Sequence, residues 1–377
     1  MKYYIIAGEA SGDLHAANLI KAIKQRNAQA EFRAWGGDMM QQQGAQVVKH
    51  YRDLAFMGFL EVVQNLGTIL SNIKFCKQDI LAYRPDALIL VDYPGFNLRI
   101  AKWAKQQGIK VIYYISPQLW AWNEARVESI KRSVDLMLVI LPFEEEFYQK
   151  HNYKVHFVGH PLLDAIEERG VRSEEGLESN AENKLGTGNR QLATILLLPG
   201  SRKQEISKML PIMLSVVKHF PQYQFIVAGA PSQPTDFYQN IIGANNVKVI
   251  SGQTYNLLAN AHAALVTSGT ATLETALFNV PQVVCYKGSW ASYQLAKRLI
   301  KVKYISLVNL ILDKPAVIEL IQDELTEENL VKELKNIVAE SAIRQAMLAD
   351  FIALKTKLGG IGASARAAGT IIDFMKK

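Results

Sequence analysis

Two short motifs in the second half of the chain have the residue types that bind a phosphate group. Leu198-Pro-Gly-Ser-Arg202 and Ser268-Gly-Thr-Ala-Thr-Leu-Glu274 each follow an apolar, strand-like run and open a helix-like one. Small residues at such a junction leave the first backbone N–H groups of the helix open to an anion. Arg202 adds a cation beside one motif, and Glu274 adds a carboxylate that suits ribose hydroxyls. Together they predict a site for the diphosphate and ribose of a nucleotide-sugar.

The charged residues of these motifs also have structural explanations. Arg202 could form a surface ion pair with Glu205, and Glu274 could interact with the positive end of a helix dipole. We favour the functional interpretation because both residues lie in companion loops of one predicted domain.

A polar turn in the first half, Gly8-Glu-Ala-Ser-Gly-Asp13, connects the first apolar run to the first helical pattern. In α/β proteins, ligands bind at this kind of junction, where a parallel strand ends and a helix begins. The turn is not a G-x-G-x-x-G fingerprint and has no P-loop lysine. It is either a ligand-binding turn or a tight turn in which Ser11 or Asp13 caps the helix.

Asp92 is a lone carboxylate after the buried run Ala87–Val91, within Val91-Asp-Tyr-Pro-Gly-Phe-Asn97. Glycosyl transfer needs a general base that takes a proton from the acceptor hydroxyl, and a carboxylate in a partly apolar cleft can do so. The alternative is that Asp92 only caps the turn before Pro94, and the pattern leaves both interpretations open.

Three further segments are rich in apolar or aromatic residues. Ser116-Pro-Gln-Leu-Trp-Ala-Trp122 could hold an acyl chain or a sugar face, although core packing is the better explanation for at least one tryptophan. Phe56–Val63 is a patch for a partner or a membrane if exposed, and core if buried. Lys287–Tyr304 could rest on anionic lipid through Lys297, Arg298, Lys301 and Lys303, but a solvated helix face is favoured.

Short β-rich runs alternate with helical patterns along most of the chain, which predicts parallel sheets covered on both faces. The expected strands are 3–7, 32–35, 87–91, 111–115, 136–140 and 155–158, then 193–198, 225–228, 247–250, 264–267 and 282–286. The expected helices include 13–26, 58–84, 97–107, 326–357 and 363–375. We therefore predict an α/β fold with an N-terminal Rossmann-like domain (1–166), a polar linker (167–190), a second Rossmann-like domain (191–345) and C-terminal helices (346–377). These helices are expected to pack on the N-terminal domain or on a partner subunit.

Composition sets limits on the function. A chain of 377 residues with 49% hydrophobic and 20% charged residues can form two cores. A net charge of +7 fits an anionic substrate, an anionic membrane surface or nucleic acid, or simply a mildly basic protein. Nucleic acid is the weakest of these, because the basic residues are dispersed. Two cysteines exclude a disulfide framework and fit a reducing cytoplasm.

Neither a metal nor a membrane span is predicted. His156 and His160 share a strand face, but nothing nearby completes a metal site, and the chain has no Asp-x-Asp motif. We expect no cofactor. The N-terminus is interpreted as a first strand and not a signal peptide, and the apolar runs are too short to span a bilayer. Any membrane contact is therefore expected to be peripheral.

Nine motifs, taken in order, resemble the lipid-A-disaccharide synthase family. They are Gly8–Asp13, Met57–Val62, Asp92–Asn97, Ser116–Trp122, Leu141–Glu144, Phe157–Pro161, Leu198–Arg202, Ser268–Glu274 and Ser306–Asn309. The resemblance implies the GT-B architecture, in which two Rossmann-like domains face each other across a cleft. It also implies transfer of 2,3-diacylglucosamine from its UDP derivative to 2,3-diacylglucosamine 1-phosphate (lipid X), with inversion and without a metal. The product would be the β-1,6-linked disaccharide 1-phosphate.

The resemblance also assigns roles to residues. Asp92 is the expected base, with Glu9 in reserve. The residues expected on the acceptor side are Gly8, Ser11, Gly12, Asp13 and Gln118. Those expected around UDP are Ser201, Arg202, Glu205, Ser268, Gly269, Thr270, Glu274 and Asn309. The resemblance further implies a cytoplasmic protein at the inner membrane and a homodimer, with exchange of C-terminal segments left open.

Two other functions fit the same residues. One is another GT-B enzyme that uses UDP-GlcNAc, either a MurG-like transferase or a 2-epimerase. The other is a non-catalytic nucleotide-binding protein that uses the apolar patch near Phe59 for partners. Transfer to lipid X, as opposed to epimer formation from UDP-GlcNAc, separates the enzymes in one assay.

Overall fold

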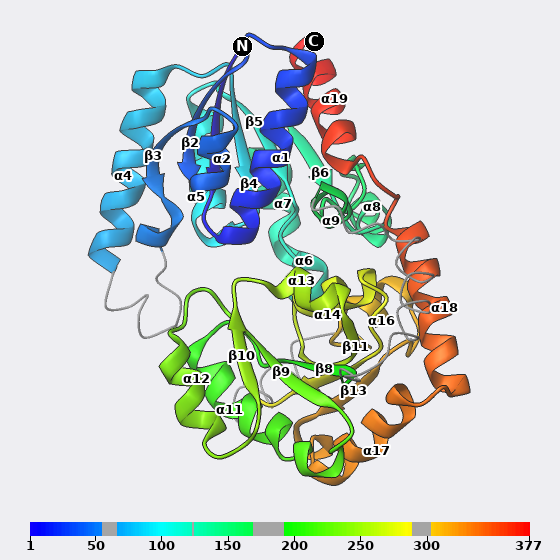
Figure 1. The fold of residues 1–377 in the computed structure, drawn as a ribbon. Helices are drawn as coiled ribbons and strands as arrows, with labels where there is room; N and C mark the ends of the chain where they lie inside the picture. Colours follow the sequence, from blue (N-terminus) through cyan, green and yellow to red (C-terminus); the bar gives the residue numbers. More distant parts are fainter. Residues whose placement is uncertain (55–65, 123, 169–191, 289–302) are drawn as a thin grey trace. The chain divides into compact units, whose positions relative to one another are not determined.

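A computed structural model describes residues 1–54, 66–122, 124–168, 192–288 and 303–377. By its internal contacts the chain divides into two units, which are coloured along the sequence in Figure 1. Unit 1 comprises Met1–Glu168 and Leu358–Lys377, and unit 2 comprises Arg169–Lys357. The patch Phe56–Val63, nearly all of the expected linker and most of Lys287–Tyr304 lie outside the described residues.

Unit 1 is built on a parallel sheet of seven strands in the order β3-β2-β1-β4-β5-β6-β7. The strands are β1 (Lys2–Ala7), β2 (Glu31–Gly36), β3 (Gln46–His50), β4 (Ala87–Val91), β5 (Lys110–Tyr114), β6 (Leu136–Val139) and β7 (His156–Phe157). The chain runs outward in opposite directions from β1 and β4, so these two neighbours form the topological switch point. The loops after β1 and β4 therefore lie next to each other.

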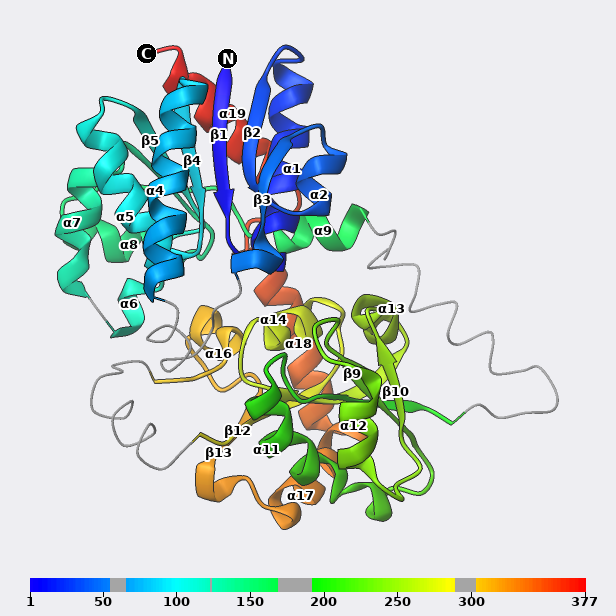
Figure 2. The same cartoon turned by 90° about the vertical axis from the view of Figure 1, so that its left-hand side faces the viewer.

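Helices cover both faces of this sheet, with α4 and α5 on one face and α1 and α2 on the other (Figure 2). They are α1 (Ala10–Arg26), α2 (Asp38–Gln42), α4 (Leu66–Tyr83), α5 (Pro94–Gln106), α6 (Leu119–Trp122), α7 (Val127–Ser133), α8 (Phe143–Lys150), α9 (Leu162–Glu168) and α19 (Ala363–Met375). Short 3-10 turns occupy Tyr51–Leu54 and Glu124–Arg126. The core consists of apolar side chains of the central strands β1, β4, β5 and β6. These strands are buried except at Lys2 and Lys110, the first residues of β1 and β5.

The last helix, α19, belongs to unit 1 and packs on α1. Its N-terminus is capped by Asp164 of α9, whose carboxylate accepts hydrogen bonds from the N–H groups of Gly362 (2.6 Å), Ala363 (3.2 Å) and Ser364 (2.7 Å). An acidic cap at this position satisfies backbone donors and interacts favourably with the helix dipole. The C-terminal segment is thereby joined to the first unit.

Unit 2 repeats the design with six parallel strands in the order β10-β9-β8-β11-β12-β13. The strands are β8 (Thr194–Leu198), β9 (Gln224–Gly229), β10 (Lys248–Ser251), β11 (Ala261–Thr267), β12 (Gln282–Tyr286) and β13 (Ile318–Ile321). The helices are α11 (Lys203–Leu214), α12 (Thr235–Ile242), α13 (Thr254–Ala259), α14 (Thr270–Leu277), α16 (Leu307–Leu312), α17 (Glu327–Val338) and α18 (Ala342–Lys357), with 3-10 turns at Val217–His219 and Gln322–Glu324. Here the switch point lies between β8 and β11, so the two glycine-containing loops are neighbours.

The prediction of two Rossmann-like parallel-sheet domains is confirmed. Two edge strands, β3 and β13, were not predicted, because each is short and its side chains are mostly only half buried. The single helix expected over 326–357 is two helices separated at 339–341. Since α18 contacts α14, α16 and α17, the division between units falls after Lys357 and not after residue 345.

Among the described residues, no helix has both the length and the apolar character needed to cross a bilayer.

Candidate active site and nucleotide site

The loops after β1 and β4 meet at Gly8. A Cβ atom on Gly8 would lie 2.4 Å from two ring carbons of Tyr93, so only glycine lets these loops approach so closely. Glu9 follows as the residue before α1, partly exposed at the same edge of the sheet. The structure therefore brings the predicted Gly8 turn and Asp92 together.

Asp92 and Tyr93 both have backbone conformations in the left-handed region, with φ of 47° and 49°. Such conformations cost free energy for non-glycine residues and persist only where surrounding contacts hold them. Three hydrogen bonds do so at Asp92: its N–H donates to the Tyr114 carbonyl (3.1 Å), and its carbonyl accepts from Tyr113 Oη (2.6 Å) and Asn97 Nδ2 (2.8 Å). The turn that carries the carboxylate is thus fixed from both neighbouring segments.

The environment of Asp92 suits a general base. Burial and, secondly, the nearby Glu9 charge raise the pKa of its carboxyl group to about 6, while a hydrogen bond from the Tyr93 N–H opposes the shift. A carboxylate with a pKa close to the working pH can both accept a proton and be ionised beforehand.

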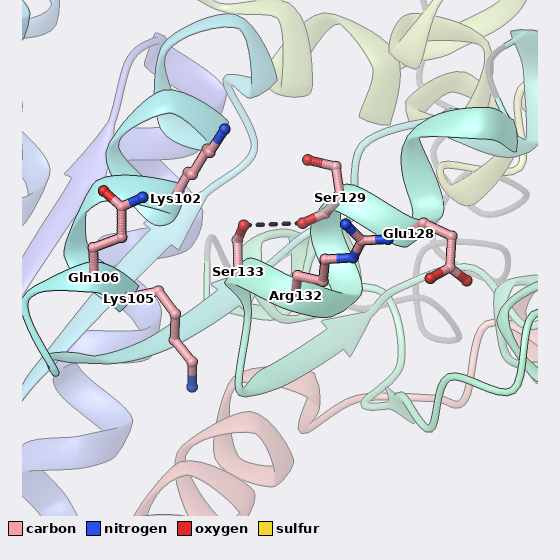
Figure 3. Close-up of a pocket in the computed structure, with 7 residues that line it drawn as sticks. All are labelled: Lys102, Lys105, Gln106, Glu128, Ser129, Arg132 and Ser133. Atoms are coloured by element: carbon pink, nitrogen blue, oxygen red, sulfur yellow. Dashed lines mark hydrogen bonds between the residues drawn. The ribbon is translucent and has the colours of Figure 1, made fainter.

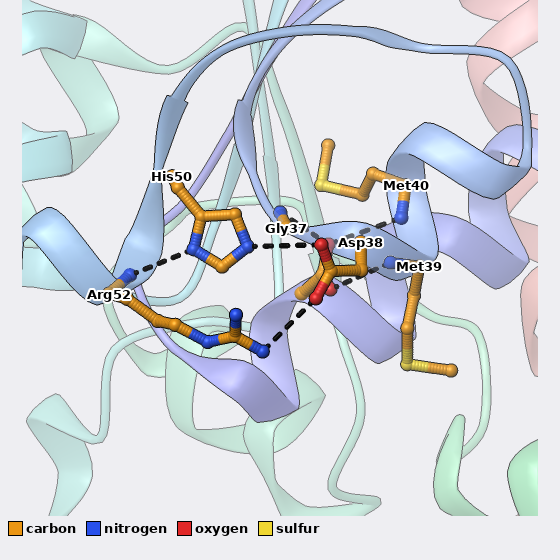
Figure 4. A network of polar contacts seen from close by, with 7 residues as sticks. Gly37, Asp38, Met39, Met40, His50 and Arg52 are labelled. Atoms are coloured by element: carbon orange, nitrogen blue, oxygen red, sulfur yellow. Dashed lines mark hydrogen bonds and ion pairs between the residues drawn. The ribbon is translucent and has the colours of Figure 1, made fainter.

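Asp13 has a structural contact in place of the ligand contact that we expected. It is 2% exposed, and its oxygens accept from the N–H groups of Gly37 (2.7 Å), Met39 (3.1 Å) and Met40 (3.2 Å). Figure 4 shows these bonds at the start of α2. We therefore remove Asp13 from the acceptor-side set, because its carboxylate caps α2.

The exposed partners around this cap form their own polar network (Figure 4). Asp38 pairs with Arg52 (3.1 Å) and lies 3.5 Å from Nε2 of His50, whose Nδ1 accepts from the Arg52 N–H. The network joins the end of β3 to the start of α2. Exposed pairs of this kind contribute little stability, so we assign it no further role.

The other predicted acceptor-side residues differ in exposure. Ser11 and Gln118 are exposed, the latter on the loop after β5. Gly12 is buried, and a Cβ there would lie 3.2 Å from Cβ of Ala7, so it packs α1 onto β1. Trp120 packs edge-on against Phe143, with ring centroids 4.9 Å apart. At least this tryptophan therefore has the packing role that the sequence allowed.

In unit 2, the loop after β8 is closed by Glu205. Gly200 has φ of 107°, and Oε2 of Glu205 accepts from the N–H groups of Ser201 (3.2 Å) and Arg202 (3.4 Å). These are N–H groups that we expected to bind phosphate. Glu205 is thus a cap of α11, and because its charge opposes an anion we no longer propose it as a nucleotide contact. Arg202 remains exposed beside it.

The start of α14 is better suited to an anion. Its first turn contains no acidic residue, and Gly269 and Thr270 are exposed. Within the described residues, the N–H groups of Thr270 and Ala271 donate to no protein acceptor. Ser268 is anchored through its hydroxyl to the Ile305 carbonyl (3.1 Å). The α14 N-terminus is therefore the stronger of the two predicted phosphate cradles.

Glu274 lies one turn inside α14 and is oriented by a residue that sequence reasoning missed. Oη of Tyr255, on α13, donates to Oε1 of Glu274 at 3.0 Å. The Tyr255 ring packs on Phe278, with centroids 5.3 Å apart. Tyr255 belongs to none of the sequence motifs. It meets Glu274 because α13 and α14 lie together in the fold, which the local sequence does not predict.

Asn309 does not present its side chain to a ligand. It is 1% exposed; its Nδ2 donates to the Val317 carbonyl (2.9 Å) and to Oε1 of Glu319 (2.9 Å), and its Oδ1 accepts from the Val317 N–H (2.9 Å). Glu319 also accepts from the N–H and hydroxyl groups of Ser306. We therefore correct the predicted nucleotide contact: the Asn309 side chain joins α16 to the beginning of β13. Glu319 was missed because β13 was not predicted.

The histidines considered for a metal have other surroundings. His160 is 6% exposed, its Nδ1 accepts from the Leu162 N–H (3.2 Å), and burial together with the nearby His15 lowers its pKa to about 3. His156 is half buried. In the parts of the chain that the structure describes, no three His, Cys, Asp or Glu side chains gather as metal ligands would.

A separate hollow of about 310 Å³ lies between α5 and α7 (Figure 3). It is lined by Lys102, Lys105, Gln106, Glu128, Ser129, Arg132 and Ser133. These residues belong to the last turns of α5 and to α7, towards the amino ends of the strands, which is the opposite edge from Asp92. Cations there complement the negative ends of helix dipoles. We assign the hollow no substrate.

The two sheets and the polar residues at their switch points define a protein of the GT-B class. Among solved structures, the fold resembles S. aureus MnaA in a co-structure with UDP, with a TM-score of 0.68 and 14% identity over 100% of this chain and 97% of that one. Residues 3–362 match the model of the lipid-A-disaccharide synthetase family. The lipid-A-disaccharide synthase of Syntrophus aciditrophicus is 39% identical over 384 residues, which cover 99% of this chain and 97% of the relative. That of Geobacter sulfurreducens is 37% identical over 379 residues, with the same coverage. The chain therefore belongs to the lipid-A-disaccharide synthase family and is a glycosyltransferase.

Proposed function

We propose that this protein transfers 2,3-diacylglucosamine from its UDP derivative to 2,3-diacylglucosamine 1-phosphate, with Asp92 as the general base. Family membership supports the reaction class, since the relatives that carry this name align over nearly the whole chain. The observation that carries the residue assignment is the fixed, left-handed turn at Asp92 combined with its raised pKa. Strained conformations and perturbed pKa values of this kind concentrate at functional sites.

The proposed chemistry is a single displacement. The Asp92 carboxylate takes the proton of the acceptor 6-hydroxyl as its oxygen forms a bond to the anomeric carbon of the donor sugar. The bond from that carbon to the diphosphate oxygen breaks, and UDP leaves with the electron pair, so the configuration inverts. The N–H groups at the start of α14 and the Arg202 guanidinium would stabilise the charge that develops on the leaving diphosphate.

The direct test is incubation of the purified protein with both diacylated glucosamine substrates, followed by mass spectrometry of the products. The expected products are UDP and a disaccharide 1-phosphate, formed only when both substrates are present. Formation of an epimer from UDP-GlcNAc without a disaccharide would instead favour the 2-epimerase alternative.

Arg202→Ala is expected to weaken UDP binding by about 10-fold or more, because a hydrogen bond to a charged group contributes about 1.5–3 kcal/mol. Isothermal titration calorimetry with UDP measures this. The adjacent Lys203→Ala provides a control, since Lys203 lies over the Phe237 ring at 5.4 Å and has no proposed contact with UDP. Equal affinities for the wild type and Arg202→Ala would exclude Arg202 from the nucleotide site.

We further propose peripheral contact with the inner membrane and a homodimeric state. Support for the first comes from α4, which exposes Leu70 (64%), Phe75 (44%) and Leu81 (49%) beside Lys74 and Lys77. Apolar and basic residues together favour an anionic bilayer surface. Flotation with vesicles that contain anionic phospholipid tests the contact, and analytical ultracentrifugation tests the dimer. A protein that stays at the bottom of the gradient, or sediments as a monomer, would contradict the respective proposal.

A further inference from the structure

The loop after β5 begins with a strained residue. Ile115 has φ of 66°, which is rare for a β-branched side chain and costs on the order of 1–3 kcal/mol. Its N–H donates to the Leu138 carbonyl at 3.1 Å. The loop that follows carries the exposed Gln118 at the carboxyl edge of the sheet, and β5 is the direct neighbour of β4, which Asp92 follows. Something must therefore hold this loop in a costly conformation next to the proposed base.

A buried polar cluster lies behind the loop. Ser116 is 5% exposed, Glu144 is 1% exposed and Tyr148 is fully buried. Ser116 Oγ and Tyr148 Oη are 2.7 Å apart and share a hydrogen bond. Oε2 of Glu144 accepts from the N–H groups of Ile140 (3.1 Å) and Leu141 (2.9 Å), which follow β6. The cluster thus spans the segments that follow β5 and β6.

Glu144 faces donors on its other side as well. Burial raises the pKa of its carboxyl group to about 7, although the Leu141 and Ile140 N–H groups and then the Ser116 and Trp120 side chains favour the charged form. Nε1 of Trp120 is itself buried and makes no hydrogen bond of good geometry within the described residues. Burying a carboxyl group costs free energy that an apolar side chain would avoid. A stabilising role alone therefore does not explain a carboxyl group at this position.

We propose that Glu144 is a positioning residue for the acceptor side of the reaction. Its hydrogen bonds from Ile140 and Leu141 fix the start of α8, whose Phe143 ring packs on Trp120 and whose Tyr148 hydroxyl bonds Ser116. The loop 115–120 is thereby held so that the Gln118 amide hydrogen-bonds a polar group of the acceptor sugar. The inference rests on the proposed function, because it assigns the acceptor to unit 1. The cluster contains residues from two sequence motifs, Ser116–Trp122 and Leu141–Glu144, to which the proposed displacement step assigns no role.

Steady-state kinetics of Glu144→Gln test the proposal. The amide keeps the shape and can still accept from Ile140 and Leu141, but it lacks the negative charge that strengthens these hydrogen bonds at the start of α8. The KM for the acceptor is expected to rise by about 10-fold or more, as for a lost hydrogen bond to a fixed group, while the KM for the UDP donor stays within about 2-fold. Glu146→Gln is the matched control, because Glu146 is 74% exposed on the same helix and pairs with the exposed Lys150.

A second variant keeps the inference testable if Glu144→Gln does not fold. Ser116→Ala removes only the hydroxyl that bonds Tyr148 (2.7 Å) and the Pro117 carbonyl (3.1 Å), and is expected to raise the acceptor KM selectively in the same way. An unchanged acceptor KM in a folded Glu144→Gln, or equal rises for both substrates, would overturn the proposal. Absence of disaccharide formation by the wild type would instead contradict the proposed function itself, so the two failures are distinguishable.

Discussion

Asp92→Asn is expected to reduce turnover by about 10²-fold or more while leaving UDP affinity nearly unchanged. The asparagine keeps the size of the side chain but cannot accept the proton of the acceptor hydroxyl, and loss of a general base has an effect of this size. Nucleotide affinity is expected to persist because the proposed UDP contacts belong to unit 2. Single-turnover rates and calorimetry with UDP separate the two effects. A variant with turnover like the wild type would remove Asp92 from the mechanism.

The raised pKa of Asp92 also predicts the pH dependence of catalysis. Because the base must be ionised, kcat/KM of the wild type should fall with decreasing pH below a value near 6, by about tenfold per pH unit. The residual activity of Asp92→Asn should lack this acid limb. An acid limb centred near pH 4 in the wild type would show that Asp92 titrates as an ordinary carboxyl group.

The same shift has a consequence for stability, with a definite sign. A carboxyl group whose pKa is raised on folding binds protons more tightly in the folded state, so its contribution to stability falls as pH rises from about 3.8 through about 6. Above that range the buried charge costs up to about 3 kcal/mol. Asp92→Asn should therefore raise the melting temperature at pH 8 but not at pH 3. The control Asp53→Asn, at a site 58% exposed, should change little at either pH.

Gly8→Ala is expected to lower turnover by about 10²-fold and to destabilise unit 1 by about 1–3 kcal/mol. The added Cβ would lie 2.4 Å from the Tyr93 ring, so the ring must move, and Asp92 is the residue that precedes it. Gly95→Ala is the matched control, since a Cβ at Gly95 meets nothing within 4 Å. Thermal unfolding and kcat measure the two effects.

A double variant shows whether the clash is the cause. Truncating the ring in Gly8→Ala/Tyr93→Ala makes room for the new methyl group, so the cost of Gly8→Ala should be smaller in this background than in the wild type. Equal costs in both backgrounds would mean that the effect of Gly8→Ala arises elsewhere, for example from the backbone.

Much of this site was predictable because the positions of its loops follow from local pattern. Alternation of apolar runs with helical periodicity locates the carboxyl ends of strands, and so predicts that the loops at Gly8, Asp92, Ser201 and Ser268 share an edge of their sheets. Residue types then indicate the chemistry, as for the lone carboxylate of Asp92. These predictions need only a few residues on either side of each motif.

The predicted ligand contacts were wrong for polar side chains that can hydrogen-bond either to a ligand or to other groups of the protein. Asp13 caps a helix that begins 25 residues later, and Asn309 bonds to β13, an edge strand with a weak sequence pattern. Glu205 caps its own helix, and the local sequence was compatible both with this cap and with a nucleotide contact. Packing between separate elements decides the partners of Asp13 and Asn309, and it also explains why Tyr255 and Glu319 were missed.

The cap between Asp164 and the start of α19 has a consequence for how the chain matures during translation. Its partners are separated by 198 to 200 residues, and all of unit 2 is encoded between them. In a nascent chain, the surface of α1 that α19 covers therefore stays open until the codons for α19 have been read. Unit 1 begins before unit 2 and is completed after it, so a premature stop codon ahead of α19 would damage the unit whose strands are translated first.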